Sequence, residues 1–127
     1  PNPAAHFGAT AGYDLVEEVG VARIREASLA HTQLLIELAD EAGFEVVSPR
    51  EEARRGGSVV LRVPEFAAVH AELEARAILC DFRPDAGIRL GPHFFTTEDE
   101  LRFVIAQIAE ILESRAYERH LGVAAVH

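Results

Sequence analysis

Lysine is missing from this sequence, so all 12 of its basic residues are arginines. The chain therefore has no side-chain amine that could form a Schiff base with a carbonyl group. Methionine is also absent, even at position 1, so we expect the chain to be a fragment or a processed product of a longer protein.

Cysteine and long apolar runs are equally scarce. The single cysteine, Cys80, excludes an internal disulfide. Its apolar surroundings predict a packed side chain, with a reactive thiol as the alternative. No apolar run approaches the roughly 18 residues of a membrane span, and no signal-peptide pattern is present. We therefore expect a cytoplasmic protein.

The charge balance is acidic, with 21 Asp and Glu against 12 basic residues and a formal net charge of -9. Nucleic acids and anionic membrane surfaces attract basic proteins, so neither is an expected partner. The His, Cys, Asp and Glu residues show no metal-ligand spacing, and no G-x-S-x-G nucleophile motif occurs. The composition thus predicts neither a metal site nor a catalytic nucleophile.

The length and a hydrophobic fraction of 49% are typical of one domain with a real core. Apolar periodicity predicts helices separated by short strands, an α+β domain in which helices cover a short, mostly antiparallel sheet. The expected helices span residues 7–19, 21–42, 65–76 and 97–114, and the expected strands span 44–47, 58–63, 78–82 and 88–90. We assign 1–20 to a linker helix, 21–114 to the domain and 115–127 to a peripheral tail.

Local signals support several of these boundaries. Gly43 is a helix stop, and Pro64 takes the first-turn position that proline prefers in a helix. Thr97 and Glu100 have the spacing of a capping box. The segment from Arg83 to Gly87 has the composition of a tight turn.

Arg89 is the strongest candidate for chemistry. It lies between Ile88 and Leu90, whose side chains would point to the opposite face of a strand. A guanidinium there can bind a carboxylate through two charge-assisted hydrogen bonds. The alternative is a salt bridge across the hairpin to Asp81 or Asp85, and the spacing alone favours that alternative.

Two further features remain open. Arg54 and Arg55, followed by two glycines, could bind an anion or form a solvated loop. His93 follows a Gly-Pro corner, where it could orient a substrate or cap the turn.

Three stretches together resemble the C-terminal domain of kynureninases. They are the "(T/S)PR" turn with its "RRG" loop within 17–61, the "D(F/Y)R-P…-RFG" segment at 81–91, and the linker helix at 1–15. Kynureninases are fold-type I enzymes that use pyridoxal phosphate. They cleave kynurenine or its 3-hydroxy form to an anthranilate and alanine.

By this resemblance Arg89 holds the α-carboxylate of an amino-acid substrate, and His93 and Arg55 are secondary candidates for substrate binding. The family binds its cofactor through a lysine, so that residue and the cofactor-binding residues would belong to an upstream large domain. We therefore expect pyridoxal phosphate in a longer parent enzyme, a homodimer, but no cofactor or turnover in this chain alone. An isolated domain should also associate through its exposed apolar surface.

Two departures keep other functions open. After Arg89 the chain reads "GPHFFTTEDEL", closer to class V aminotransferase-like enzymes such as cysteine desulfurases and epimerases than to the "TPLY" of kynureninases. Ser58 also stands where many kynureninases have a histidine. The alternatives are a domain of such an enzyme or a free-standing, non-catalytic binding domain.

Overall fold

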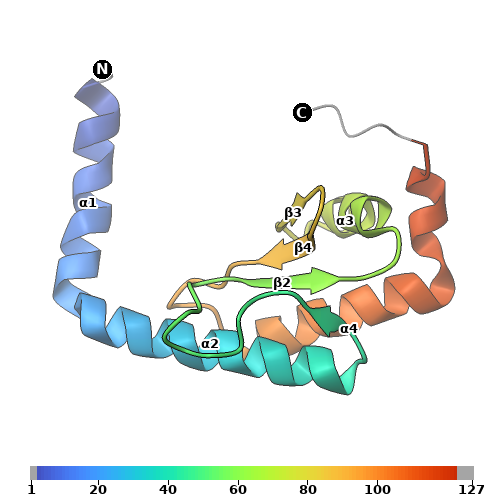
Figure 1. Cartoon of the computed structure of the whole chain (residues 1–127). Helices are drawn as coiled ribbons and strands as arrows, with labels where there is room; N and C mark the ends of the chain where they lie inside the picture. Colours follow the sequence, from blue (N-terminus) through green and yellow to red (C-terminus); the bar gives the residue numbers. More distant parts are fainter. Residues whose placement is uncertain (1–2, 123–127) are drawn as a thin grey trace.

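The computed structural model describes residues 3–122, with side chains from residue 8 onward. Pairs of short strands lie between the helices along the chain (Figure 1). The helices are α1 (Pro3–Val19), α2 (Val21–Glu41), α3 (Phe66–Ala75), α4 (Glu98–Ser114) and the 3-10 helix η1 (Ala116–His120). The strands are β1 (Glu45–Val46), β2 (Val59–Arg62), β3 (Asp81–Arg83) and β4 (Gly87–Leu90).

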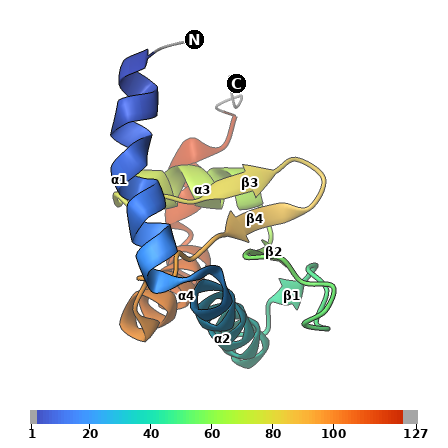
Figure 2. The same cartoon turned by 90° about the vertical axis from the view of Figure 1, so that its left-hand side faces the viewer.

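A sharp corner at Gly20 separates α1 from α2. Gly20 has a φ of 87°, a conformation that favours glycine, and its carbonyl accepts a hydrogen bond from Ile24 at 3.1 Å. The corner turns α1 away from the sheet and the other helices (Figures 1 and 2). This position agrees with the predicted role of α1 as a linker, although the division of the chain at residue 20 stays a prediction.

The four strands form one antiparallel sheet in the order β1-β2-β4-β3. Strand β4 is central, because β2 pairs with one of its edges and β3 with the other. In this register Ile88 lies between Leu61 of β2 and Phe82 of β3. The short connection between β3 and β4 is the turn predicted at residues 83–87.

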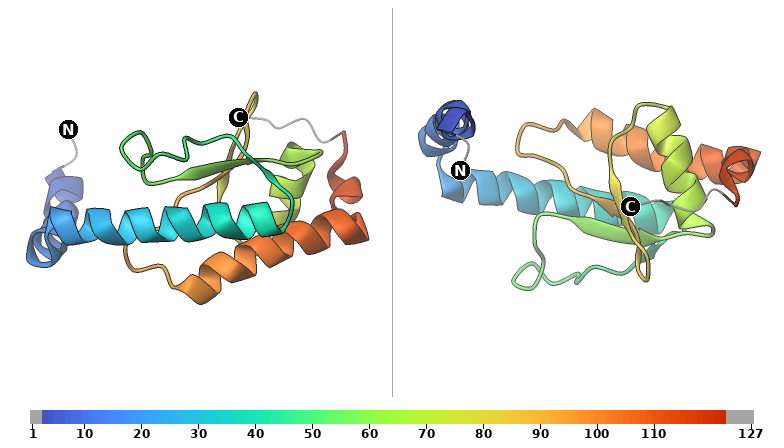
Figure 3. Two further views of the ribbon diagram at one scale, coloured as in Figure 1. Left: turned by 60° about the horizontal axis from the view of Figure 1, so that its bottom comes forward. Right: turned by 90° about the horizontal axis from the view of Figure 1, so that it is seen from above.

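Helices α2 and α4 run along one face of the sheet, and α3 lies beside β3 and β4 (Figure 3). The core forms between these helices and the sheet, from apolar side chains that recur at helical spacing or alternate along a strand. Its fully buried members include Leu35, Leu61, Leu73, Ile88, Ile108 and Ile111. The opposite face, here called the open face, carries the partly or fully exposed Val60, Arg62 and Arg89.

Several expected boundaries need correction. The helix expected at 7–19 begins four residues earlier, at Pro3. The helix predicted to start at Glu65 starts at Phe66, because Glu65 has a φ of 49° and serves as the N-cap, its carbonyl accepting from Val69 N–H. Pro64, expected in the first turn, therefore precedes the N-cap and lies outside the helix. The strand expected at 78–82 is shifted to 81–83. Ile78 N–H instead closes the end of α3 through a 2.9 Å bond to the Leu73 carbonyl. Strand β3 therefore contains only Asp81, Phe82 and Arg83, which lie opposite β4.

The chain after Ser114 forms η1, which packs on α3. The carboxylate of Glu72, fully buried on α3, holds it there. Arg119 Nε donates to Glu72 at 2.7 Å, and His120 Nε2 lies 2.9 Å from the same carboxylate oxygen. Residues 115–122 thus have a defined anchor that the fading apolar pattern does not indicate, and the rest of the tail expected at 115–127 lies outside the described residues.

Candidate functional site

Arg89 lies in the centre of the open face. Its neighbours Ile88 and Leu90 are buried in the core, whereas the Arg89 side chain is 39% exposed. Strand alternation explains this contrast, as the sequence pattern predicts. Directly opposite Arg89 are Val60 on β2 and Asp81 on β3. The guanidinium therefore has an apolar neighbour on one side and a carboxylate on the other.

Asp81 pairs with two arginines. Arg89 Nη2 donates to Asp81 Oδ2, and Arg83 Nη2 lies 3.3 Å from the same oxygen. Arg83 is two residues along β3 from Asp81 and so projects from the same face. We refer to Arg83, Asp81 and Arg89 as the Asp81 triad. Of the two salt bridges that the sequence suggests for Arg89, the structure forms the one to Asp81.

The Asp81 triad combines two guanidinium groups with one carboxylate and is net positive. Within the described part of the chain, Asp81 is the one hydrogen-bond acceptor of Arg89, so most guanidinium N–H groups stay available. A hollow of about 420 Å³ at the sheet edge is lined by Asp81 and Arg83 together with His70, Cys80, Phe82 and Pro84, and Arg89 is not among its lining residues. Such a group can bind an external carboxylate or phosphate.

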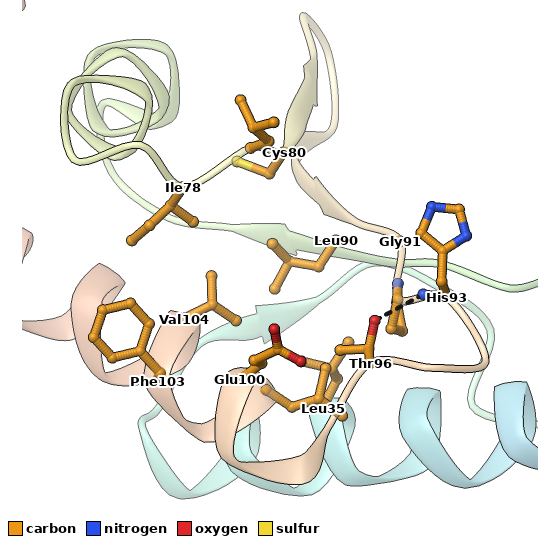
Figure 4. A pocket seen from close by; sticks show the side chains of 13 residues that line it. Leu35, Ile78, Cys80, Leu90, Gly91, His93, Thr96, Glu100, Phe103 and Val104 are labelled. Atoms are coloured by element: carbon orange, nitrogen blue, oxygen red, sulfur yellow. Dashed lines mark hydrogen bonds between the residues drawn. The ribbon is translucent and has the colours of Figure 1, made fainter.

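His93 lies apart from the triad, at the rim of a second cavity of about 310 Å³ (Figure 4). Its backbone N–H donates to Thr96 Oγ1 at 3.0 Å, and its ring stacks on Phe95 with centroids 5.0 Å apart. The cavity is mainly apolar and includes Leu90. Among the described residues Arg89 does not line it, since Leu90 and Arg89 point to opposite faces of β4. The structure therefore does not bring His93 and Arg89 into one cavity.

Arg55 is placed differently from the sequence expectation. Its side chain is only 2% exposed and points toward α2, where Nε donates to Thr32 Oγ1 at 3.0 Å. Nη2 donates to Gln33 at 3.3 Å, and Nη1 donates to the Arg50 carbonyl. These contacts occupy the guanidinium within the protein. They favour a structural role for Arg55 over substrate binding.

Arg25 completes the attachment of this loop, with Nη2 donating to the carbonyls of Glu52 and Arg55 at 3.0 and 2.8 Å. Arg54 stays exposed. Arg25 and Arg55 therefore attach the "RRGG" loop to α2 through hydrogen bonds. The periodicity of the sequence predicts this role for neither residue.

Cys80 has the properties of a packed residue. Burial, together with the nearby charges of Glu74 and Asp81, raises the pKa of its thiol to about 11. Little thiolate is then present at neutral pH, so Cys80 is a poor nucleophile. Among the side chains described, from residue 8 to residue 122, no group of three or more His, Cys, Asp or Glu could hold a metal ion. None of the described helices is long and apolar enough to cross a membrane.

The comparison with family models decides the relationship of this chain. The model of the kynureninase C-terminal domain matches residues 24–108, which include the whole Asp81 triad. The chain belongs to the kynureninase C-terminal domain family. The predicted family is thereby confirmed.

Similar proteins support the assignment. The chain is 29% identical over 111 residues to the kynureninase of Bacillus thuringiensis subsp. konkukian and 34% identical over 111 residues to that of Pseudomonas fluorescens. Each alignment covers 84% of this chain, but 26% and 27% of the respective relatives. This kynureninase C-terminal domain therefore spans about a quarter of the length of these relatives.

A solved structure confirms the predicted fold class. The apo cysteine desulfurase of Thermococcus onnurineus NA1 superposes with a TM-score of 0.79 at 20% identity, over 90% of this chain and 32% of the desulfurase. At this identity the likeness concerns the fold alone. The chain thus has the α+β architecture expected of a fold-type I C-terminal domain.

The contribution of Arg83 to the site is absent from the sequence expectations, where this residue serves only as the start of a turn. Its role depends on the register of β3 against β4, which sets Asp81 opposite Arg89. The available signal is the two-residue spacing of Asp81 and Arg83 before a tight turn, because that spacing puts both on one face.

Proposed function

We propose that this chain is the C-terminal domain of a kynureninase that converts L-kynurenine to anthranilate and L-alanine. In this proposal Arg89 binds the α-carboxylate of the substrate. The supporting observation is a half-exposed guanidinium in the centre of the open face, inside the segment that matches the family. The secondary candidate His93 has no contact with this group among the described residues and is not needed for the proposal.

Pyridoxal phosphate is the cofactor of the proposed parent, where it would supply an electron sink for the reaction. The residues of this chain do not fit the task of holding it. No lysine is present to bind it covalently, and the net-positive Asp81 triad is the site we assign to substrate. The cofactor and its lysine would belong to an upstream large domain, and this chain by itself would be inactive.

The proposed contribution of Arg89 is orientation. A planar guanidinium that takes both oxygens of a carboxylate fixes the position and the rotation of the amino acid. Correct placement of the reacting bond can lower the barrier by several kcal/mol. Arg89 itself takes part in no bond cleavage or proton transfer.

Substitution of Arg89 in the full-length parent tests this proposal. Loss of a charge-assisted pair predicts that Arg89→Ala raises KM for kynurenine by about 30-fold or more, with the cofactor absorbance unchanged. Arg89→Lys should restore little, because an ammonium group cannot form the planar fork. The matched control is Arg62→Ala, on the same face but paired with Glu45. Unchanged kinetics in Arg89→Ala would contradict the proposal.

A second candidate is a class V aminotransferase-like enzyme, such as a cysteine desulfurase. It is favoured by the "GPHFFTTEDEL" segment after Arg89. A substrate panel on the full-length parent separates the two. Turnover of kynurenine well above that of cysteine supports the first proposal, and the reverse supports the second. A full-length product no larger than this chain would instead favour a binding domain.

We further propose that the parent is a homodimer in which surfaces exposed here are covered by the large domain or by the partner. Several large apolar side chains are exposed in this chain: Tyr13, Val21, Leu79, Phe95 and Phe103 are 55% to 91% accessible. Leu79 and Phe103 line the same cavity, and a contiguous exposed apolar patch is typical of a surface that packs against another domain. The isolated chain should therefore self-associate as its concentration rises.

A further inference from the structure

Arg89 has two charged neighbours, Asp81 and Arg83, whose role depends on the proposed carboxylate binding by Arg89. We propose that Asp81 and Arg83 are positioning residues: Asp81 fixes the plane of the Arg89 guanidinium, and Arg83 offsets the charge of Asp81 so that a substrate carboxylate is not repelled.

The sheet register creates the first half of this arrangement. Asp81 and Arg89 are direct partners in the β3–β4 ladder, so their side chains leave the open face as close neighbours. On the other side, Val60 offers no polar group to compete. Of the Arg89 guanidinium nitrogens, only Nη2 donates to Asp81. This hydrogen bond restrains the flexible Arg89 side chain and leaves its Nη1 and Nε for another acceptor.

Charge explains the need for the second arginine. A carboxylate beside Arg89 would by itself cancel the positive charge that attracts an amino-acid substrate. Arg83, with Nη2 3.3 Å from the same Asp81 oxygen, restores a net positive group. The side chains of Arg83, Asp81 and Arg89 are 52%, 44% and 39% exposed, so an external carboxylate can reach them.

Local geometry keeps the three side chains together. Arg83 pairs with Gly87 across the hairpin, directly before the tight turn that joins β3 to β4. The turn closes with a 3.0 Å hydrogen bond from Ala86 N–H to the Arg83 carbonyl. The hollow lined by Asp81 and Arg83 leaves this edge of the sheet accessible.

The test uses the full-length parent and two readouts. The first is KM and kcat for the amino-acid substrate. The second is the ratio of the affinities for L-alanine and L-alaninamide, which differ in the carboxylate. A residue with a purely structural role would not change this ratio selectively. Asp85→Ala is the matched control, since Asp85 carries the same charge in the adjoining turn and makes no contact with Arg89 among the described residues.

Asp81→Ala should raise KM about 10-fold, leave kcat within about 2-fold, and lower the alanine preference about 5-fold. Asp81→Glu should recover part of both effects. Arg83→Ala should raise KM about 3-fold in the native background. In a chain that already carries Asp81→Asn it should have little effect, because the proposed role of Arg83 is to offset the charge of Asp81. The near-isosteric Asp81→Asn variant keeps the test informative if Asp81→Ala fails to fold.

The outcomes separate this inference from the proposed function. If Arg89→Ala weakens binding but the Asp81 variants leave KM and the alanine preference unchanged, the positioning role is wrong and the role of Arg89 stands. If Arg83→Ala raises KM equally with and without Asp81→Asn, the proposed offset of the Asp81 charge by Arg83 is also wrong. If Arg89→Ala changes neither readout, the proposed carboxylate site itself is wrong.

Discussion

At position 87 the sheet has room for nothing larger than a hydrogen atom. Gly87 has a φ of 130°, and an added Cβ would collide with the carbonyl group of Leu61 on β2. This close approach of backbones lets β4 pair with β2 while β3 pairs with its other edge. Gly87 therefore allows the strand pairing that places Ile88 in the core and Arg89 on the open face.

Gly87→Ala should destabilise the chain by at least about 2 kcal/mol, because backbone strain adds to the collision. The free energy of unfolding from a denaturant titration measures the effect. Gly56→Ala is the matched control, since a Cβ at Gly56 meets nothing within 4 Å and its φ is ordinary. A similar, small effect of both substitutions would contradict the proposed close approach.

At the scale of elements, α4 has the best-defined start. Thr97 Oγ1 accepts from Glu100 N–H at 3.3 Å, while the Glu100 carboxylate accepts from Thr97 N–H at 2.8 Å. The predicted capping box is thus confirmed. It directs α4 along the sheet, where Leu101, Ile105 and Ile108 enter the core.

Thr97→Ala should lower the free energy of unfolding by about 1 kcal/mol, the usual loss for an N-cap. Thr97→Ser is the control, because it keeps the hydroxyl acceptor. We expect a measurably lower thermal midpoint for the alanine variant and a nearly native one for the serine variant. Equal midpoints for the two variants would mean that the hydroxyl contributes nothing.

Elements specified by neighbouring residues could be predicted, whereas those specified by distant partners could not. Helical periodicity predicts α2 and α4, Gly43 marks the end of α2, and the capping box marks the start of α4. The alternation of side chains along a strand predicts the outward position of Arg89. The short β3 depends on which residues lie opposite β4. The loop around Arg55 depends on Thr32, 23 residues earlier, and η1 depends on Glu72, so their sequences carry no local signal.

At the scale of the whole molecule, Glu72 links three helices. It accepts from Arg76, the C-cap of its own helix, and from Arg119 on η1, and Arg76 also donates to Gln107 of α4 at 2.8 Å. The hydrogen bond from Arg119, followed by those from Arg76 and His120, lowers the pKa of Glu72 from 4.5 to about 2 despite burial. A lowered pKa in the folded state means that this carboxylate stabilises the fold above pH 4.5 and loses that effect as the pH falls toward 2.

Glu72→Gln should therefore lower the free energy of unfolding at neutral pH by about 3 kcal/mol, because it removes one partner of a buried ion-pair network. The difference from the native chain should shrink as the pH falls from 4.5 to about 2, because the unfolded chain takes up a proton on Glu72 over this interval while the folded carboxylate stays ionised until the pH approaches 2. Urea titrations of both chains across this interval measure it. Glu110→Gln, at the exposed end of the network, should have a much smaller effect. A pH-independent difference would rule out the charge of Glu72 as the cause.

The narrow fit at Gly87 also determines where this domain tolerates changes in length. An insertion or deletion within the turn at residues 84–86 leaves the pairing of β2 with β4 in place and alters only the tip of the hairpin. One residue inserted between Gly87 and Arg89 would exchange the two faces of the remaining strand, turning the guanidinium into the core and Leu90 outward. Homologous sequences should therefore vary in hairpin length at the tip, while the two-residue interval from this glycine to the arginine stays constant.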